Sequence, residues 1–371
     1  MELLKPNAML SFITSNGWLK SAYGKSLRAL LAEQYNPLKL IDFAGFKVFD
    51  SATVDVNILN IEKQIPLGQT YACSIRKDEF DIEKLSDYVR THTVVSAFSS
   101  SDSWSILSEI EKSIKAKIEA VGMPLKDWDI QINYGIKTGC NDAFIIDSIK
   151  RNEILDNCTT EEERQKTAEI IRPILRGRDV CRYGYEWGDL WLINTHNGIK
   201  GKLERIHIED YPSIKQHIDN YWDKIESRTD QGDTAYNLRN CAYLDEFSKP
   251  KIIWIELSDE SKFALCDDLV PLNTVFFLTG NHLNHILGLL NSKLIHWYFT
   301  TCLGTSSGVG TNRWLKYTIE QLPLVCHTDE DLSQLVAARL SDKTNVSICE
   351  SKIDSLICKM YGLTQEECAY V

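Results

Sequence analysis

The order of elements predicted at the start of the chain limits its fold more than any other feature of the sequence. Residues 9–14 form a short apolar run that indicates a buried strand, and residues 18–31 carry apolar side chains at helical spacing. Two more strands are predicted at residues 38–43 and 54–61. Strand, helix, strand, strand is the tail of an α/β sheet. One helix cannot cover both faces of such a sheet, so either this is a small layer that docks on the rest or an upstream part is missing.

The composition narrows the class of protein. The length of 371 residues suits two or three domains, and 43% hydrophobic with 25% charged residues is typical of a soluble globular protein. Eleven cysteines without a Cys-x-x-Cys pair favour reduced thiols in a cytoplasmic protein. The sequence shows neither a leader segment nor a run of about 18 apolar residues, so it supports neither secretion nor membrane spanning. The net charge of −11 argues against a general polyanion binder, although a local cleft can still be basic.

Two stretches near the N-terminus carry a resemblance to a known family. Residues 3–31 and 40–63 are similar to the second half of the catalytic domain of adenine-N6 DNA methyltransferases. In that family a Gly-rich cofactor motif and an Asn-Pro-Pro-Tyr motif come earlier in the chain, and neither occurs here. The resemblance therefore implies that S-adenosylmethionine belongs to the intact enzyme, that this chain holds no cofactor, and that it is inactive alone. It also implies that Phe49 stacks on a flipped adenine; the alternative is a core anchor between loop and sheet.

A second resemblance follows from five motifs in order. Residues 134–146 read YGIKTGCNDAFII, and residues 173–183 read PILRGRDVCRY. The segments KPKIIWIELSD, LNSKLIHWYF and NRWLKYTIEQLPL follow, the last of them expected to be a closing strand. Together they resemble the TaqI-like C-terminal specificity domain of type IIG restriction–modification enzymes. From the residues alone, the Gly-bounded loop at 134–146 is equally well explained as a hairpin.

The candidate DNA-binding residues come from three of these segments. Arginine suits guanine edges and phosphates, lysine and threonine suit phosphates, and asparagine suits adenine edges. The candidates are Lys137, Thr138, Asn141, Arg176, Arg178, Arg182, Ser306, Ser307, Thr311, Asn312, Arg313 and Lys316. The alternatives are a structural salt bridge to Asp179 for the arginines and a plain surface loop for the last six residues. His282 and His285 have no acidic or cysteine partner in sequence, so no metal site is predicted.

The fold class predicted from these patterns is α+β. Residues 1–65 are expected to form a partial α/β, Rossmann-like methyltransferase layer, and residues 66–104 a linker or crossover with a short helix. Residues 105–325 are expected to form the target-recognition domain, and residues 326–371 a helical tail.

The predicted function is sequence-specific DNA recognition that positions a flipped adenine for methylation. Its predicted partners are double-stranded DNA and a missing N-terminal methyltransferase segment, with or without a nuclease; the chain is otherwise expected to be a monomer. One alternative is a non-catalytic remnant that binds a protein partner, and another is an enzyme with an unrecognised active site. Tighter binding to duplex DNA at low salt would separate a DNA-binding protein from the remnant.

Overall fold

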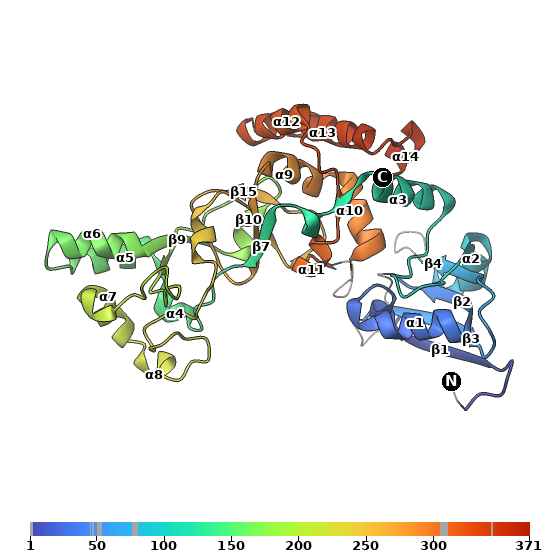
Figure 1. Cartoon of the computed structure of the whole chain (residues 1–371), viewed down its shortest axis with the longest axis horizontal. Helices are drawn as coiled ribbons and strands as arrows, with labels where there is room; N and C mark the ends of the chain where they lie inside the picture. The colour runs from blue at the N-terminus through green and yellow to red at the C-terminus, as the bar shows by residue number, and fades with distance from the viewer. Residues whose placement is uncertain are drawn as a thin grey trace.

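The computed structural model describes residues 3–44, 46, 48–49, 54–75, 81–304, 311–342 and 344–371. Helices and several separate sheets make an α+β fold that is elongated in Figure 1, with the N-terminal sheet at one end and helices α5–α8 at the other. Within the described residues, no helix combines the length and the apolar character needed to cross a membrane.

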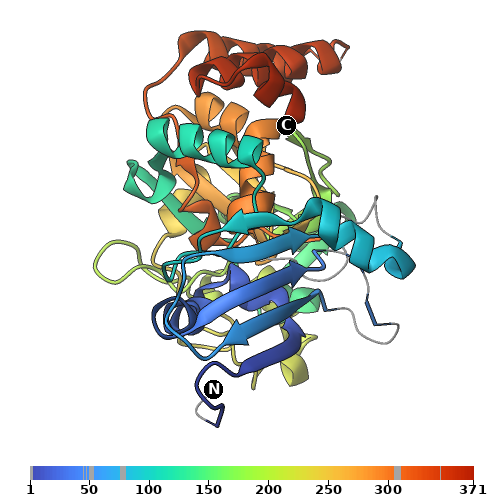
Figure 2. The ribbon, with the colours of Figure 1, turned by 90° about the vertical axis from the view of Figure 1, so that its right-hand side faces the viewer.

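The N-terminal part is built around a five-stranded sheet. Its elements are β1 (Met9–Ser15), α1 (Lys25–Gln34), β2 (Asn36–Asp42), β3 (Val56–Glu62), β4 (Thr70–Ser74), α2 (Leu85–His92) and β5 (Val94–Ser96). The strand order is β1-β3-β2-β4-β5. β3 runs antiparallel to both β1 and β2, and β2 runs parallel to β4. β1 and β2 are therefore parallel to each other and joined by α1, with β3 inserted between them; Figure 2 faces this sheet.

Alternate side chains of this sheet enter two separate cores. Leu40 packs with Trp18 and Trp104 on one face, while its neighbour Ile41 packs with Val89 of α2 on the other. This is the two-residue period of a strand whose faces are both covered. Trp18 and Trp104 meet edge to face at 5.5 Å, and Phe98 stacks on Trp104 at 4.7 Å. Aromatic residues that follow β5 thus cover one face of the sheet.

Three predictions for this part are corrected. Residues 66–104, expected to be a linker or crossover, contribute β4 and β5 to the same sheet, while the short helix expected there is present as α2. The strand predicted at residues 9–14 exists as β1, but it is an edge strand with exposed side chains rather than a buried one. The helix predicted at residues 18–31 begins only at Lys25; two short 3-10 turns, Asn16–Leu19 and Ala22–Gly24, precede it.

The larger part contains two four-stranded sheets. One has the order β15-β13-β17-β7, from β7 (Ile130–Tyr134), β13 (Lys251–Ile255), β15 (Ala264–Cys266) and β17 (Val275–Gly280). The other has the order β16-β9-β12-β8, from β8 (Ile145–Asp147), β9 (Ile171–Leu175), β12 (Leu190–Ile193) and β16 (Val270–Pro271). β7 and β8 lie in different sheets, so residues 134–146 do not form the hairpin that was considered.

The remaining elements are mostly helices. In chain order they are α3 (Glu109–Val121), β6 (Met123–Pro124), α4 (Asn141–Phe144), α5 (Ser148–Asp156), α6 (Glu161–Ile170), β10 (Val180–Cys181), β11 (Gly184–Tyr185), α7 (Pro212–Asp219), α8 (Trp222–Ile225), β14 (Leu257–Ser258), α9 (Leu283–Asn291), α10 (Lys293–Tyr298), β18 (Asn312–Arg313), α11 (Lys316–Ile319), β19 (Pro323–Leu324), α12 (Glu330–Ser341), α13 (Val346–Met360) and α14 (Gln365–Tyr370). The segment 312–324 is therefore not one closing strand: two short strands flank a helical turn.

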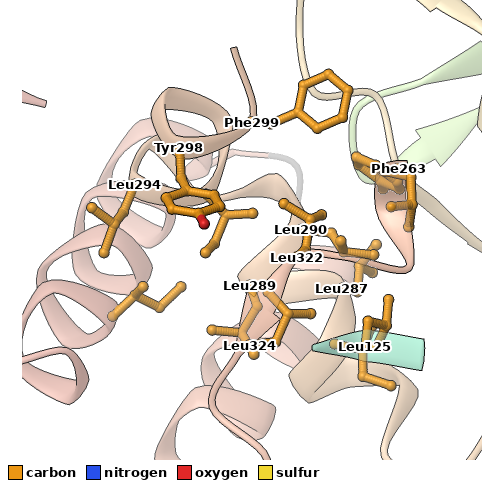
Figure 3. Packing of buried hydrophobic residues seen from close by; sticks show 14 of the residues in the cluster. Leu125, Phe263, Leu287, Leu289, Leu290, Leu294, Tyr298, Phe299, Leu322 and Leu324 are labelled. Atoms are coloured by element: carbon orange, nitrogen blue, oxygen red, sulfur yellow. The ribbon is translucent and has the colours of Figure 1, made fainter. Parts of the chain in front are cut away.

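The sheet that contains β13 and β17 separates two large cores. Trp254 and Phe276 face the helices on one side, whereas Ile253 and Phe277 face the second sheet. Figure 3 shows the helical side, where leucines of α9 meet Leu322 and Leu324. The C-terminal helices belong to this core, since side chains of α12 and α13 are buried in it. The predicted tail is therefore helical and is also a structural layer of the larger part.

Candidate functional site

A hollow lies where the two four-stranded sheets meet. It is a groove of about 1070 Å³, and we refer to it as the basic groove. The ends of β7, β13 and β9 converge there with the segments 239–243 and 272–274. Its lining includes Tyr134, Lys137, Arg176, Gly177, Arg178, Arg239, Asn240, Tyr243, Ile255, Glu256, Asn273 and Thr274. Four of these side chains are cationic, so this acidic protein does have a locally basic cleft.

Lys137 reaches the basic groove because the chain changes sheets immediately before it. The Gly135 N–H donates to Val275 O at 2.9 Å, and the Ile136 N–H donates to Pro271 O at 2.8 Å. A Cβ atom at residue 135 would lie 2.1 Å from the carbonyl oxygen of Leu272, so only glycine fits this crossing. Lys137 follows as an exposed side chain, and no carboxylate of the described residues lies within ion-pair distance of it.

Arg176 is held in place by Asp179. Its Nε donates to Oδ2 at 3.0 Å and its Nη2 donates to Oδ1 at 2.8 Å, a bidentate pair across the Gly177 turn. Burial alone would raise the pKa of the Asp179 carboxyl, but the hydrogen bonds from Arg176 hold that pKa below its ordinary value. A Cβ atom at residue 188 would lie 2.1 Å from Nη2 of Arg176, so the guanidinium occupies the space that Gly188 leaves. The structural salt bridge considered for the arginines is thus present for Arg176.

Arg178 has a different environment two positions later. Its side chain is exposed in the basic groove, and within the described ranges no carboxylate lies within ion-pair distance of it. Gly177, immediately before it, packs against Thr274 and Ile255, which fixes the turn on the edge of the β13 sheet. A free guanidinium on a fixed turn can bind a phosphate or the edge of a guanine.

Arg239 is a groove residue that the sequence did not reveal. Its Nη1 lies 3.0 Å from Oδ1 of Asp230, and the side chain remains more than half exposed. It comes from the connection between α8 and β13, which contains little regular structure. Long irregular connections in compact domains often carry function, so the length of this segment was the available signal.

Of the other predicted DNA-binding residues, those that the structure describes do not line the basic groove. Thr138 is buried and donates to Oδ1 of Asn141 at 2.6 Å, and Arg182 pairs with Glu350 at 3.0 Å. Lys316 donates to the carbonyl oxygen of Ile132 at 2.7 Å. Thr311 and Asn312 are half-buried, Arg313 is exposed, and Ser306 and Ser307 lie outside the described residues.

A second group of polar residues lies at the carboxyl ends of β1 and β2. Asn16 donates to Oδ1 of Asp42 at 2.9 Å, and Lys20 donates to the carbonyl oxygen of Thr300 at 3.0 Å. Burial raises the pKa of the Asp42 carboxyl to about 6, although the hydrogen bond from Asn16 opposes this shift. In open α/β sheets, ligands bind outside the carboxyl ends of the strands. Phe49 follows β2, is 45% exposed and belongs to none of the described core clusters.

No metal centre is evident in the part of the chain that the structure describes. No group of three or more His, Cys, Asp and Glu side chains there could hold an ion. His282 precedes α9 in a left-handed conformation, and Nε2 of the buried His285 is 2.9 Å from the carbonyl oxygen of Val325. The two histidines therefore have local roles at the start of α9.

Two parts of the chain match models of known protein families. Residues 172–324 match the TaqI-like C-terminal specificity domain, and residues 1–49 match the Eco57I restriction-modification methylase. The first match contains Arg176, Arg178 and Arg239, and it covers most of the lining of the basic groove.

The full-length relatives are methyltransferases. The chain is 22% identical to the type II methyltransferase M.BanIII of Aneurinibacillus aneurinilyticus, over 97% of this chain and 69% of that protein. It is 20% identical to the type II methyltransferase M.BstVI of Geobacillus stearothermophilus, over 99% of this chain and 66% of that protein. The chain therefore spans about two thirds of the length of these relatives.

A solved structure shares the fold. The type IIL restriction-modification enzyme MmeI, determined in complex with DNA, aligns over 98% of this chain and 48% of its own chain, with a TM-score of 0.59 and 12% identity. These findings define the class: the chain is related to the methyltransferases of type II restriction–modification systems. Within that class, residues 172–324 are a TaqI-like C-terminal specificity domain, and residues 1–49 are related to the Eco57I methylases.

Proposed function

We propose that this chain recognises a sequence in double-stranded DNA through the basic groove. The observation that carries the proposal is the groove itself, about 1070 Å³ in volume, in which Lys137 and Arg178 stand exposed without carboxylate partners among the described residues. Cations that already bind a buried carboxylate must lose that partner to bind DNA, whereas these two are available. Arg178 is the contact to a base edge or phosphate, and Lys137 the contact to a phosphate.

The proposal extends to the reaction that DNA recognition serves. The N-terminal sheet is a Rossmann-like methyltransferase layer, supported by parallel β1 and β2 joined through α1. A target adenine, flipped from the helix, is positioned for N6 methylation beside Phe49. The exposed aromatic ring of Phe49, in the segment that follows β2, supports this, because a flipped base that has lost its neighbours is held by stacking. S-adenosylmethionine and the catalytic motifs come from another segment, and the system is cytoplasmic, where bacterial DNA is accessible.

The surface that contacts that segment consists of the unpaired edge of β1 and the exposed side of α1. Tyr23, Leu27 and Leu30 follow helical spacing and are all exposed, Tyr23 by 72%. Met9 and Phe12, from opposite faces of the edge strand β1, are exposed by 59% and 57%. A strand with apolar side chains on both faces is typical of the interior of an α/β sheet. The surface also supports the second candidate function, a module that binds a protein partner without methylation.

Titration of the chain with duplex DNA across a salt series tests the first proposal. A DNA-binding protein shows affinity that falls steeply as salt rises, in proportion to the phosphates contacted. We expect this dependence for the wild type, and a change in preferred sequence for Arg178→Ala. Equal affinity at all salt concentrations, or no binding at low salt, would contradict recognition of DNA by this chain and would favour the protein-partner module.

Co-expression of this chain with the preceding segment of a relative such as M.BanIII tests the proposed docking surface on β1 and α1. A complex with Leu27→Asp should not form, because burying a charge in an apolar interface is unfavourable. Lys25→Asp at the start of the same helix, outside the stripe that Tyr23, Leu27 and Leu30 form, is the matched control and should assemble normally. A stable complex with Leu27→Asp would exclude this face as the docking surface.

A further inference from the structure

The basic groove contains a carboxylate that its general charge does not explain. Glu256, between β13 and β14, is the single acidic residue among those that line it. A negative charge in a groove that binds phosphates opposes binding, since like charges repel. Its presence there is explained if the carboxylate accepts a hydrogen bond from a donor on the ligand.

The backbone of Glu256 is fixed by the aromatic core. The Trp314 N–H donates to the carbonyl oxygen of Glu256 at 2.7 Å, and β14 pairs with β18 directly after it. Nε1 of Trp254 donates to Trp314 O at 2.9 Å, and Nε1 of Trp314 donates to Ser258 O at 3.0 Å. Trp314 also stacks on Phe299 at 3.8 Å. A side chain mounted on so rigid a support can discriminate between ligand groups.

The carboxylate of Glu256 has only a loose ionic neighbour. Nη2 of Arg313 is 3.8 Å away, which is too far for a hydrogen bond. None of the described side chains or N–H groups donates a hydrogen bond to it. Both side chains remain close to half exposed. The acceptor capacity of this carboxylate is therefore open to a ligand.

Arg178 and Glu256 both line the basic groove. Arg178 directly follows Gly177, and Glu256 directly follows Ile255. Gly177 and Ile255 are in contact, since a Cβ atom at Gly177 would lie 3.4 Å from Cγ2 of Ile255. The groove thus presents a rigid-fork donor next to an acceptor. In the major groove, guanine offers two acceptors, O6 and N7, and cytosine offers a donor, the N4 amino group. A guanidinium can bind both acceptors of a guanine, and a carboxylate can accept a hydrogen bond from the amino group of a cytosine.

We propose that Glu256 recognises the N4 amino group of a cytosine adjoining the guanine that Arg178 binds. This inference rests on the proposed function, because it assigns the bases that the basic groove reads. It makes Glu256 a specificity-determining residue. The carboxylate favours cytosine over bases that present an acceptor at that position, since two acceptors facing each other leave both without a donor.

Selection from a randomised duplex library with the full 371-residue chain tests the proposal. The wild type should enrich sites that contain an invariant cytosine and an invariant guanine. Glu256→Gln should lose the cytosine, or replace it with adenine, whose N6 and N7 suit an amide. Binding of the wild-type site should fall by about 5- to 150-fold. Glu256→Asp keeps the charge but withdraws it by one methylene, so it should also weaken the cytosine preference.

Two controls separate base recognition from a structural role. Glu320→Gln removes an equally loose ion pair, Lys316 to Glu320 at 3.7 Å, outside the basic groove, and should leave the selected sequence unchanged. Arg313→Gln should leave the cytosine preference intact. If Arg313→Gln and Glu256→Gln change the selected sequence in the same way, or if Glu256→Gln and Glu256→Asp retain the cytosine, Glu256 does not recognise it. Absence of any enriched sequence with the wild type would instead overturn DNA recognition itself.

Discussion

Replacement of Arg176 by alanine should destabilise the protein rather than change what it recognises. The change removes two hydrogen bonds, at 2.8 and 3.0 Å, from the carboxylate of Asp179, which is only 8% exposed. A buried carboxylate that loses its partner costs about 3–5 kcal/mol; because the Arg176 side chain is itself 24% exposed, we expect about 2–4 kcal/mol here. At about 2–4 °C for each kcal/mol in a domain of this size, the melting temperature should fall by roughly 5–15 °C.

The pH dependence of this loss has a definite sign. The pKa of Asp179 in the folded protein lies below its ordinary value, and the hydrogen bonds from Arg176 are the cause of that net direction. A lowered carboxyl pKa contributes stability that is fully present above the unfolded pKa of about 3.9 and is lost as the pH falls through the folded pKa. The difference in stability between wild type and Arg176→Ala should therefore be full at pH 7 and shrink below about pH 4.

Urea unfolding of both proteins at several pH values measures this difference, with Arg178→Ala as the matched control. Arg178 is exposed and without a carboxylate partner in the described ranges, so its removal should change stability by no more than about 0.5 kcal/mol. It should instead weaken DNA binding by about 1–3 kcal/mol. Equal stability of Arg176→Ala and the wild type at pH 7, or a larger loss for Arg178→Ala, would refute the assignment of these two arginines.

Three further outcomes are expected. In an enzyme reconstituted with the preceding segment, Phe49→Ala should reduce methylation by about ten- to a hundredfold, because stacking of one base is worth about 1–3 kcal/mol, while Phe49→Trp retains activity; radiolabelled methyl transfer measures both. Burial raises the pKa of Asp42 to about 6, so this carboxyl becomes harder to ionise in the folded protein than in the unfolded chain. The free energy of unfolding of the wild type should therefore fall by up to about 3 kcal/mol as the pH rises from 4 to 7. Asp42→Asn should not show this fall in urea unfolding. A difference in stability between the wild type and Asp42→Asn that does not change with pH would contradict the prediction. Calorimetry of the chain alone with S-adenosylmethionine should show no binding, and micromolar affinity would refute the division of labour proposed here.

Local patterns predicted those elements whose environment is set by neighbours in sequence. Ile110, Ile114 and Ile118 lie at helical spacing before Gly122 and so predict a helix from the sequence. The structure has α3 there, which begins at a capping box on Ser108 and Glu111. The segment KPKIIWIELSD, through its resemblance to a strand of the specificity domain, predicted β13. The apolar run at residues 9–14 predicted the strand correctly but its burial wrongly, because the burial of a strand depends on the strands that pair with it. That partner is set by the whole sheet, as was the pairing of β4 and β5 within residues 66–104.

The candidate site shows why residue type alone is insufficient. Arg176 and Arg178 are the same amino acid, two positions apart in one motif, and the sequence assigned both to DNA. Both line the basic groove, but the turn at Gly177 brings only the Arg176 guanidinium onto the carboxylate of Asp179. Glu256 gave no signal in sequence, because its importance arises from side chains brought beside it by β-sheet pairing. A DNA-recognition surface is thus defined by which charges remain unpaired after folding, and that property can be read only from the folded chain.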